Sequence, residues 1–458
     1  MKAALTIADS LSEEELAAQV LMTGITGKDQ LDPAMGAILQ EIPVGAIMLF
    51  KYNIADTPQA VHAFIRQCAE QSVLRLPSPS PMLPGTSTIG MSSLVSLYSD
   101  PDVPAPAIPA SAVTTKVPAG SSDDSGSGSN RLYPFVAIDH EGGSVFRLGQ
   151  VATRLPPAAR YLSANADGEG VSSTGQSNPV DTWHIIRQAA YLSGRELRAL
   201  GITMNLAPVA EVLTPENREF LQNRSFAAEP AAAASAAAAF IQGMGEAGVV
   251  SVVKHFPSSA AADPHYGKSV LAVDKKRLEY LAAPFTALLV SGGSRQSDQS
   301  PYPQNLLSLP IMSGGVMVAH TLVPAIDPEL PASLSSRFMQ DWIKSSLGFQ
   351  GIVVADDFTM KAVTSLGISP EAAIPRAILA GADMVMVWPR DLRRFHRLLV
   401  ERAKSDTLFR QRLVDAARRI INLKLLWGLT EGTDDFNDEG YGCMRKATEQ
   451  FLRERNLR

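Results

Sequence analysis

Short runs of apolar residues alternate along most of this chain with longer stretches whose apolar positions recur every three to four residues. A buried strand of a parallel sheet is typically a continuous apolar run, whereas an amphipathic helix shows the longer period. The pattern predicts strands at Val44–Phe50, Phe135–Ile138, Ile202–Leu206, Val249–Val253, Gly315–Val318, Ile352–Ala355 and Met384–Val387. It predicts helices around them at Glu13–Met22, Thr57–Ser72, Thr182–Leu200, Pro230–Ala247, Lys275–Ser291, Ser336–Ser346 and Pro370–Ala380.

Repeated strand–helix units of this kind predict a parallel sheet, and about seven or eight of them favour an α/β fold built as a (β/α)8 barrel of the TIM type. The alternative is a doubly wound open sheet, which would be favoured by a glycine-rich phosphate loop. The glycine-rich spot Glu141-Gly142-Gly143 does not have the G-x-G-x-x-G spacing of such a loop. We therefore expect the barrel.

Three segments rich in Pro, Ser and Gly interrupt the pattern, at residues 77–130, 164–180 and 292–305. Their composition cannot bury enough apolar surface to fold alone. We therefore expect flexible insertions in a single catalytic domain that spans residues 1–429. A polar C-terminal tail at residues 430–458, with room for one surface helix, would follow it.

Composition narrows the function classes. The chain has 458 residues, 45% of them hydrophobic, a formal net charge of −5 and only two cysteines. The modest charge gives no reason to expect a nucleic-acid partner, and two cysteines exclude a disulfide scaffold. The segment Met1–Leu21 lacks the apolar core of a signal peptide, and no apolar run is long enough to span a bilayer. We expect a cytoplasmic protein without membrane contact, metal or cofactor.

The most informative segment is the strand at Ile352–Ala355, because it runs directly into two carboxylates, Asp356 and Asp357. An acid at the C-terminal end of a barrel strand lies where barrel enzymes place their chemistry. The alternative is that Asp357 or Thr359 only caps the helix that follows.

Polar residues follow other predicted strands in the same way. They are Asp139, Glu141, Asn205, Glu211, Lys254, His255 and His320. One such residue is usually a cap or a satisfied buried group, but five strands that end in this way are hard to explain by capping alone. In a barrel those strand ends share one rim, so we expect these groups to converge on one pocket.

The residues expected in this pocket suit the recognition of a sugar. Carboxylates accept hydrogen bonds from hydroxyl groups, and the cationic and imidazole side chains donate; the donors here are Arg147, Arg224, Lys254 and His255. Retaining glycosidases need a carboxylate nucleophile and an acid/base, and Asp356 is the natural nucleophile. Asp263, two residues before His265, could orient that imidazole for proton transfer; the alternative is an ordinary polar loop.

Several motifs together resemble the bacterial β-N-acetylglucosaminidases of glycoside hydrolase family 3, from about Leu11 to Leu429. Gly45–Phe50 with Asn53 resembles the family's first barrel strand. The other matching stretches are Ile138–Arg147, Asn205–Val209, Asn223–Phe226, Lys254–Pro257, Val318–His320, Val353–Asp356, Ala380–Asp383 and Ile420–Gly428. No single motif is decisive, but their number and order make the resemblance specific.

The resemblance implies a retaining mechanism in which Asp356 is the nucleophile and His265, paired with Asp263, is the acid/base. It also implies a set of residues that hold the terminal N-acetylglucosamine, namely Asp139, Arg147, Arg224, Lys254 and His255. The usual cellular role of the family is the release of that sugar from peptidoglycan fragments during cell-wall recycling. The expected partner is therefore a small carbohydrate, such as a muropeptide.

The chain departs from the family in the loop that should carry the acid/base. The family's Gly-His-Gly-Asp is missing after Pro257, and Pro264 replaces the serine of its Asp-Ser-His. Ser144 and His140 replace an arginine and a glutamine of the Asp139 motif. Three alternatives therefore stay open: a β-glucosidase, a glycoside phosphorylase, or a sugar-binding relative that is catalytically weak. If His265 is not the acid/base, Glu141 and His320 are the next candidates.

Overall fold

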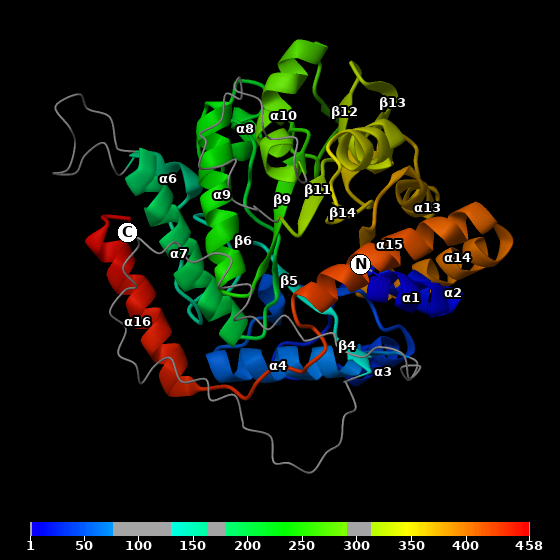
Figure 1. Cartoon of the computed structure of the whole chain (residues 1–458), viewed down its shortest axis with the longest axis horizontal. Helices are drawn as coiled ribbons and strands as arrows, with labels where there is room; N and C mark the ends of the chain where they lie inside the picture. The colour runs from blue at the N-terminus through cyan, green and yellow to red at the C-terminus, as the bar shows by residue number, and fades with distance from the viewer. Residues whose placement is uncertain (1, 77–129, 164–178, 291–312, 458) are drawn as a thin grey trace.

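Eight parallel strands close into a barrel in the computed structural model of this protein, which describes residues 2–76, 130–163, 179–290 and 313–457 (Figure 1). Each strand pairs with the next one along the chain, and the last pairs with the first. The barrel strands are β1 (Leu21–Gly24), β2 (Ala46–Leu49), β5 (Phe135–Ile138), β8 (Met204–Asn205), β9 (Val250–Phe256), β11 (Gly315–Val318), β14 (Ile352–Ala355) and β15 (Met384–Val387). The predicted (β/α)8 barrel is confirmed.

All seven predicted strands belong to the barrel, and the one that was missed is β1. The predicted helix Glu13–Met22 is wrong at its end, because α2 (Glu13–Gln19) stops before that strand. The resemblance also numbered the barrel wrongly, since Gly45–Phe50 contains the second strand and not the first. The side chains of Gln19 and Lys424 meet at this junction. Lys424 Nζ donates to Gln19 Oε1 at 2.8 Å, and both side chains are fully buried.

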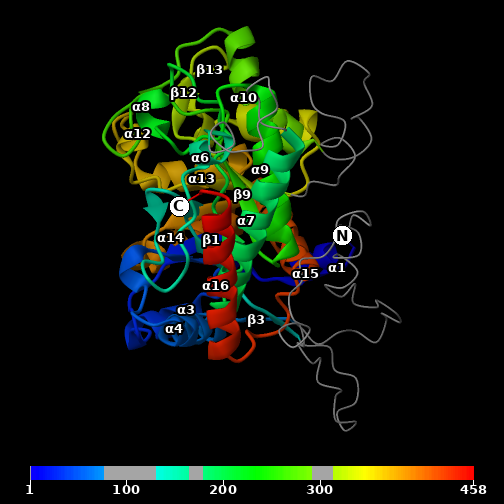
Figure 2. The ribbon, with the colours of Figure 1, turned by 90° about the vertical axis from the view of Figure 1, so that its left-hand side faces the viewer.

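Helices surround the barrel on the outside. They include α3 (Pro33–Glu41), α4 (Pro58–Gln71), α7 (Pro179–Ala199), α9 (Pro230–Glu246), α10 (Lys275–Leu289), α13 (Pro370–Ala380), α14 (Leu392–Ser405) and α15 (Thr407–Leu426). Helices α7 and α9 run side by side along one side of the barrel (Figures 1 and 2). The predicted helix Ser336–Ser346 is a π-helix, η5 (Arg337–Ser346).

The strands are almost wholly apolar because they are buried on both faces. Side chains fill the barrel interior and the helices cover its outside, so every residue of β5, β11, β14 and β15 is buried. This rigid core fixes the positions of the strand ends. The loops that carry polar groups start from those ends.

The tail after residue 429 contains the helix α16 (Asp438–Glu454), which lies along α7 (Figure 2). Its Tyr441 and Leu452 are buried, and Tyr441 Oη donates to the carbonyl of Val151 at 2.6 Å. That carbonyl belongs to the segment that follows Arg147. The helix therefore braces a loop that reaches the rim of the barrel.

The three predicted insertions fall almost entirely outside the described residues, so the domain boundaries remain a prediction. The chain on either side of the first insertion is well defined. Strand β3 (Leu74–Arg75) pairs antiparallel with β4 (Arg131–Leu132), and Leu76 N donates to Asn130 O at 2.8 Å. The residues that flank positions 77–129 are therefore neighbours.

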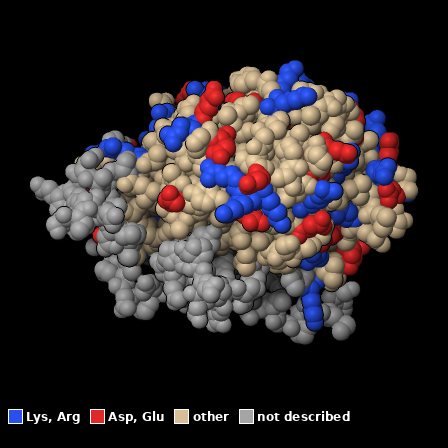
Figure 3. Space-filling view, turned by 90° about the horizontal axis from the view of Figure 1, so that it is seen from above, with Lys and Arg blue, Asp and Glu red and all other residues tan. Residues whose placement is uncertain are grey.

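Two surface properties bear on partners. Figure 3 shows basic and acidic side chains next to one another over the described part of one face. None of the helices in the described ranges is long and apolar enough to cross a membrane.

Candidate active site

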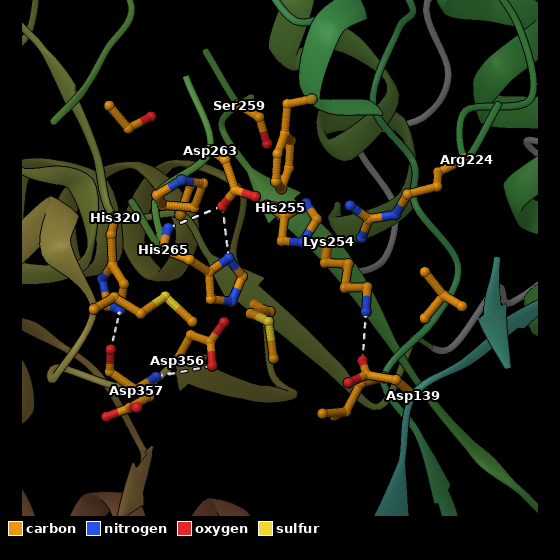
Figure 4. Close-up of a pocket in the computed structure, with 18 of the residues that line it drawn as sticks. Asp139, Arg224, Lys254, His255, Ser259, Asp263, His265, His320, Asp356 and Asp357 are labelled. Atoms are coloured by element: carbon orange, nitrogen blue, oxygen red, sulfur yellow. Dashed lines mark hydrogen bonds and ion pairs between the residues drawn. The ribbon is translucent and has the colours of Figure 1, made fainter. Parts of the chain in front are cut away.

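A pocket of about 820 Å³ opens at the C-terminal ends of the barrel strands (Figure 4). Side chains from β2, β5, β9, β11, β14 and β15, or from the loops that follow them, line it. All eight residues selected from the sequence are among them: Asp139, Arg147, Arg224, Lys254, His255, Asp263, His265 and Asp356. Residues far apart in the chain therefore converge on one rim, as the strand-end pattern predicted.

The two adjacent carboxylates after β14 have different environments. Asp357 is buried, and its oxygens accept from Thr359 N at 2.8 Å and from Trp388 Nε1 at 2.7 Å. Asp356 is less buried, and its Oδ1 accepts from Asp357 N at 2.8 Å. Within the described residues no donor occupies Asp356 Oδ2. The helix cap considered for this segment is at neither Asp357 nor Thr359, because α12 (Lys361–Thr364) has Met360 as its N-cap. Asp357 instead accepts from the backbone two residues on, while Asp356 is open to the pocket.

The His265 loop lies over the same rim. His265 Nδ1 is 2.6 Å from Asp263 Oδ1, and the same oxygen accepts from His265 N at 2.9 Å. Pro264 O accepts from Ala362 N at 2.9 Å, which ties the loop to the segment that follows Asp356. Figure 4 shows the His265 ring between Asp263 and Asp356. With Nδ1 held by a carboxylate, Nε2 is the ring nitrogen available for proton transfer.

A chain of buried ion pairs occupies the opposite side of the pocket. Lys254 Nζ lies 2.6 Å from both Asp139 Oδ1 and Glu141 Oε1, and Arg224 binds the two oxygens of Glu141 at 2.8 and 2.9 Å. Arg147 Nη2 is 3.8 Å from Asp139 Oδ2. This arrangement presents charged donors and acceptors close together, as a hydroxyl-rich ligand requires.

The ion pairs shift the pKa values of Glu141 and Lys254 in favour of their charged forms. Burial would raise the pKa of Glu141, but Lys254 and Arg224 outweigh it and hold that pKa well below its usual range. Burial would lower the pKa of Lys254, but Asp139 and Glu141 together raise it. Glu141 is therefore a permanent anion, and it cannot serve as a proton donor.

His320 is also unsuited to proton transfer with a substrate. Its side chain is buried, with Nδ1 2.7 Å from Ser333 Oγ and Nε2 3.1 Å from Asp357 O. Burial lowers the pKa of the ring, against the opposing effect of Asp356. Both ring nitrogens of His320 are thus occupied by protein groups.

The ring of His255 is held by Glu211. Glu211 was among the polar residues noted after the predicted strands, but it was not predicted to be a site residue. Glu211 is fully buried, and its Oε1 is 2.7 Å from His255 Nδ1. The carboxylate also accepts from Ser258 Oγ at 3.2 Å and from both N and Oγ of Ser259. Burial would raise the pKa of Glu211, but the bonds to His255 and Ser259 lower it.

Sequence reasoning missed the aromatic side of the pocket. Phe50 stacks between Tyr52 and Trp388, with ring centroids 5.5 and 5.2 Å apart, and Phe50 and Trp388 line the pocket. Both follow strand ends, so the same rule that selected Asp356 could have found them. Gly24, at the end of β1, leaves them room: a Cβ there would lie 3.1 Å from the Phe50 ring.

No cluster of three or more His, Cys, Asp or Glu side chains in the described part of the chain is arranged to hold a metal ion. The cations in the pocket are Lys254, Arg224 and Arg147, and they carry its positive charge.

Comparison with known sequences assigns most of this barrel to one family. Residues 119–423 match the family described as the glycosyl hydrolase family 3 N terminal domain. A β-hexosaminidase of Nitrosomonas eutropha is 33% identical over 259 residues, which are 55% of this chain and 64% of that protein. A β-hexosaminidase of Stenotrophomonas maltophilia is 31% identical over 263 residues, which are 56% of this chain and 68% of that protein. The match to the first thus spans just under two thirds of its length.

Solved structures show the same fold. The glycoside hydrolase family 3 β-N-acetylglucosaminidase from Paenibacillus sp. superposes with a TM-score of 0.67 at 22% identity, covering 96% of this chain and 69% of that one. The β-N-acetylhexosaminidase from Beutenbergia cavernae superposes with a TM-score of 0.64 at 23% identity, covering 91% of this chain and 99% of that one.

Proposed function

Because this chain belongs to glycosyl hydrolase family 3, we propose that it is a retaining β-N-acetylglucosaminidase. The observation that carries the proposal is the placement of an unoccupied Asp356 oxygen and a carboxylate-paired His265 at one pocket. The names of the sequence relatives, both β-hexosaminidases, support the choice of sugar.

In the first step Asp356 attacks the anomeric carbon, and the bond from that carbon to the leaving oxygen breaks. His265, protonated on both nitrogens, gives the Nε2 proton to the leaving oxygen, while Asp263 stabilises the charged ring through Nδ1. In the second step Nε2 takes a proton from water. The resulting hydroxide adds to the anomeric carbon and releases Asp356, so the sugar leaves with its β configuration retained.

The ion-paired side of the pocket would hold the terminal sugar. Asp139 can accept hydrogen bonds from sugar hydroxyls, and Lys254 and His255 can donate to hydroxyl oxygens. Arg224 and Arg147 add further donors, and Arg224 helps to keep Glu141 ionised. Because these groups are already paired with one another, little side-chain ordering is needed when the sugar binds.

We further propose a role in the cytoplasm, where the enzyme would release N-acetylglucosamine from muropeptides during peptidoglycan recycling. The family resemblance motivates this role. An aromatic surface that could contact a larger leaving group extends from the pocket to solvent, because Phe50 lines the pocket and stacks on half-exposed Tyr52.

The decisive experiment compares the purified protein on 4-nitrophenyl N-acetyl-β-D-glucosaminide and on the matching β-glucoside. We expect clear preference for the N-acetylated substrate and β-N-acetylglucosamine as the first product by proton NMR. Preference for the glucoside, α product, or acceleration by phosphate with formation of a sugar phosphate would each point to another activity. Binding of N-acetylglucosamine without turnover would indicate the sugar-binding alternative.

A further inference from the structure

Building on the function proposed above, we propose that Glu211 is a positioning residue that couples the sugar-binding His255 to the loop that carries His265. Glu211 lies in the segment after β8 and does not itself line the pocket. Its carboxylate reaches two separate parts of the site at once. One is the end of β9, and the other is the start of the loop that leads to Asp263.

The contacts of Glu211 divide between these two parts. Oε1 accepts from His255 N at 3.3 Å and lies 2.7 Å from Nδ1 of the same ring. Oε2 accepts from the backbone N of Ser259 and from Ser258 Oγ. Ser259 Oγ completes the set with a bond of 2.9 Å to Oε1. A fully buried carboxylate with this many donors has a single orientation and stays ionised.

This anchor matters because the loop that begins at Ser258 carries Asp263 and His265, whose side chains are 40% and 55% exposed and so have little packing of their own to hold them. The two serines that follow Pro257 each supply a hydroxyl donor to Glu211. The loop is then fixed at its start by Glu211 and further along by the bond from Ala362 N to Pro264 O. Asp263 and His265 lie in the stretch that these two anchors control.

Glutamine at position 211 tests the coupling without changing the size of the side chain. It would present one oxygen and one NH2 group to two backbone N–H donors, those of His255 and Ser259. A backbone N–H cannot turn into an acceptor, so Glu211→Gln must lose one of the two contacts. Ser259→Ala is a milder variant that removes one hydroxyl donor only.

The kinetic test uses two substrates with the same sugar. On N,N′-diacetylchitobiose, whose leaving group needs a proton, Glu211→Gln should lower kcat/KM by about 100-fold because both sugar binding and the acid are displaced. On the 4-nitrophenyl glycoside the loss should be about tenfold, since only binding through His255 suffers. In a His265→Ala background the extra loss on the disaccharide should disappear. Equal losses of kcat/KM on both substrates would overturn the coupling. So would an extra loss on the disaccharide that persists in the His265→Ala background.

Controls separate the coupling from general damage. Glu246→Gln changes an ion-paired glutamate at the end of α9, away from the pocket, and should alter neither rate by more than about twofold. Ser259→Ala should also lower the rate on the disaccharide more than the rate on the aryl glycoside, by smaller factors than Glu211→Gln. If Glu211→Gln does not fold, the test rests on Ser259→Ala. Equal losses of rate on the two substrates in that variant would overturn the proposal.

NMR tests the contacts without relying on turnover, so failure of the proposed function can be distinguished from failure of the Glu211 proposal. Protein labelled with 15N in histidine and serine should show the His255 ring with its proton on Nδ1 and a strongly hydrogen-bonded Ser259 amide. In Glu211→Gln at least one of these two signals must move. If both stay in place, Glu211 does not hold the two parts together. A protein that hydrolyses neither glycoside but shows the signal change would refute only the proposed activity.

Discussion

Truncation of His265 to alanine should separate catalysis from stability. The side chains of His265 and Asp263 are 55% and 40% exposed, and their main contact is with each other. Exposed pairs of this kind contribute at most about 1 kcal/mol, so the free energy of unfolding should change by no more than that. The catalytic loss should be far larger, because general acid catalysis contributes about 100-fold to 10,000-fold.

The assay compares a substrate that needs an acid with one that does not. His265→Ala should lower kcat on N,N′-diacetylchitobiose by about 100-fold or more, which corresponds to about 2.7 kcal/mol of transition-state stabilisation. The aryl glycoside, with its good leaving group, should lose much less in its first step. Azide should restore part of its turnover, because azide attacks the glycosyl-enzyme without a base.

A matched control lies on the same loop. Tyr266 follows His265 and is 85% exposed, and Tyr266→Ala should leave both rates nearly unchanged. The reasoning would be refuted if His265→Ala slowed both substrates equally and azide gave no rescue. It would also be refuted if Tyr266→Ala caused the same selective loss, since the loop and not the imidazole would then be responsible.

Three further outcomes are expected. Asp356→Ala should reduce turnover by about 10,000-fold or more with the fold intact, and a slow fluorinated substrate should label Asp356; a label on Asp357 would show that the neighbouring carboxylate is the nucleophile. Replacement of residues 79–129 by a short linker should keep most of the thermal stability, because Leu76 and Asn130 on either side of it are hydrogen-bonded to each other; an insoluble product would contradict this. Burial lowers the pKa of Lys424 to about 7 from its ordinary 10.5, so the unfolded chain binds more protons between these pH values and stability rises with pH across that window. Urea titrations at pH 7 and pH 10 should show a smaller rise for Lys424→Met, and an equal rise would exclude this origin.

The barrel and the polar pocket could be predicted from sequence because both depend on local patterns. A continuous apolar run identifies a buried strand, and the closed barrel then brings every strand end to one rim. The position of Asp356 directly after Ile352–Ala355 is enough to place it there. The resemblance to a family added roles for the residues, while the structure added their separate environments, above all the difference between Asp356 and Asp357.

The features that were missed depend on contacts between distant parts of the chain. Leu21–Gly24 continues the apolar pattern of α2, and only pairing with β15 and β2 makes it a strand. Glu211 follows its short strand by several residues, and its partner His255 lies 44 positions further on. No local pattern marks either residue as half of a pair.

The bond from Tyr441 to Val151 also affects how the ends of this protein can be engineered. The two residues are 290 positions apart, and Tyr441 lies beyond the stretch that matches the family. A version that ends at residue 423, the C-terminal limit of the family match, would keep every barrel strand and every residue of the pocket. It would nevertheless remove the helix that braces the segment after Arg147, so that sugar affinity could fall while catalytic chemistry survived. Truncated and fused versions of this protein should therefore keep α16, because it supports the segment that follows Arg147.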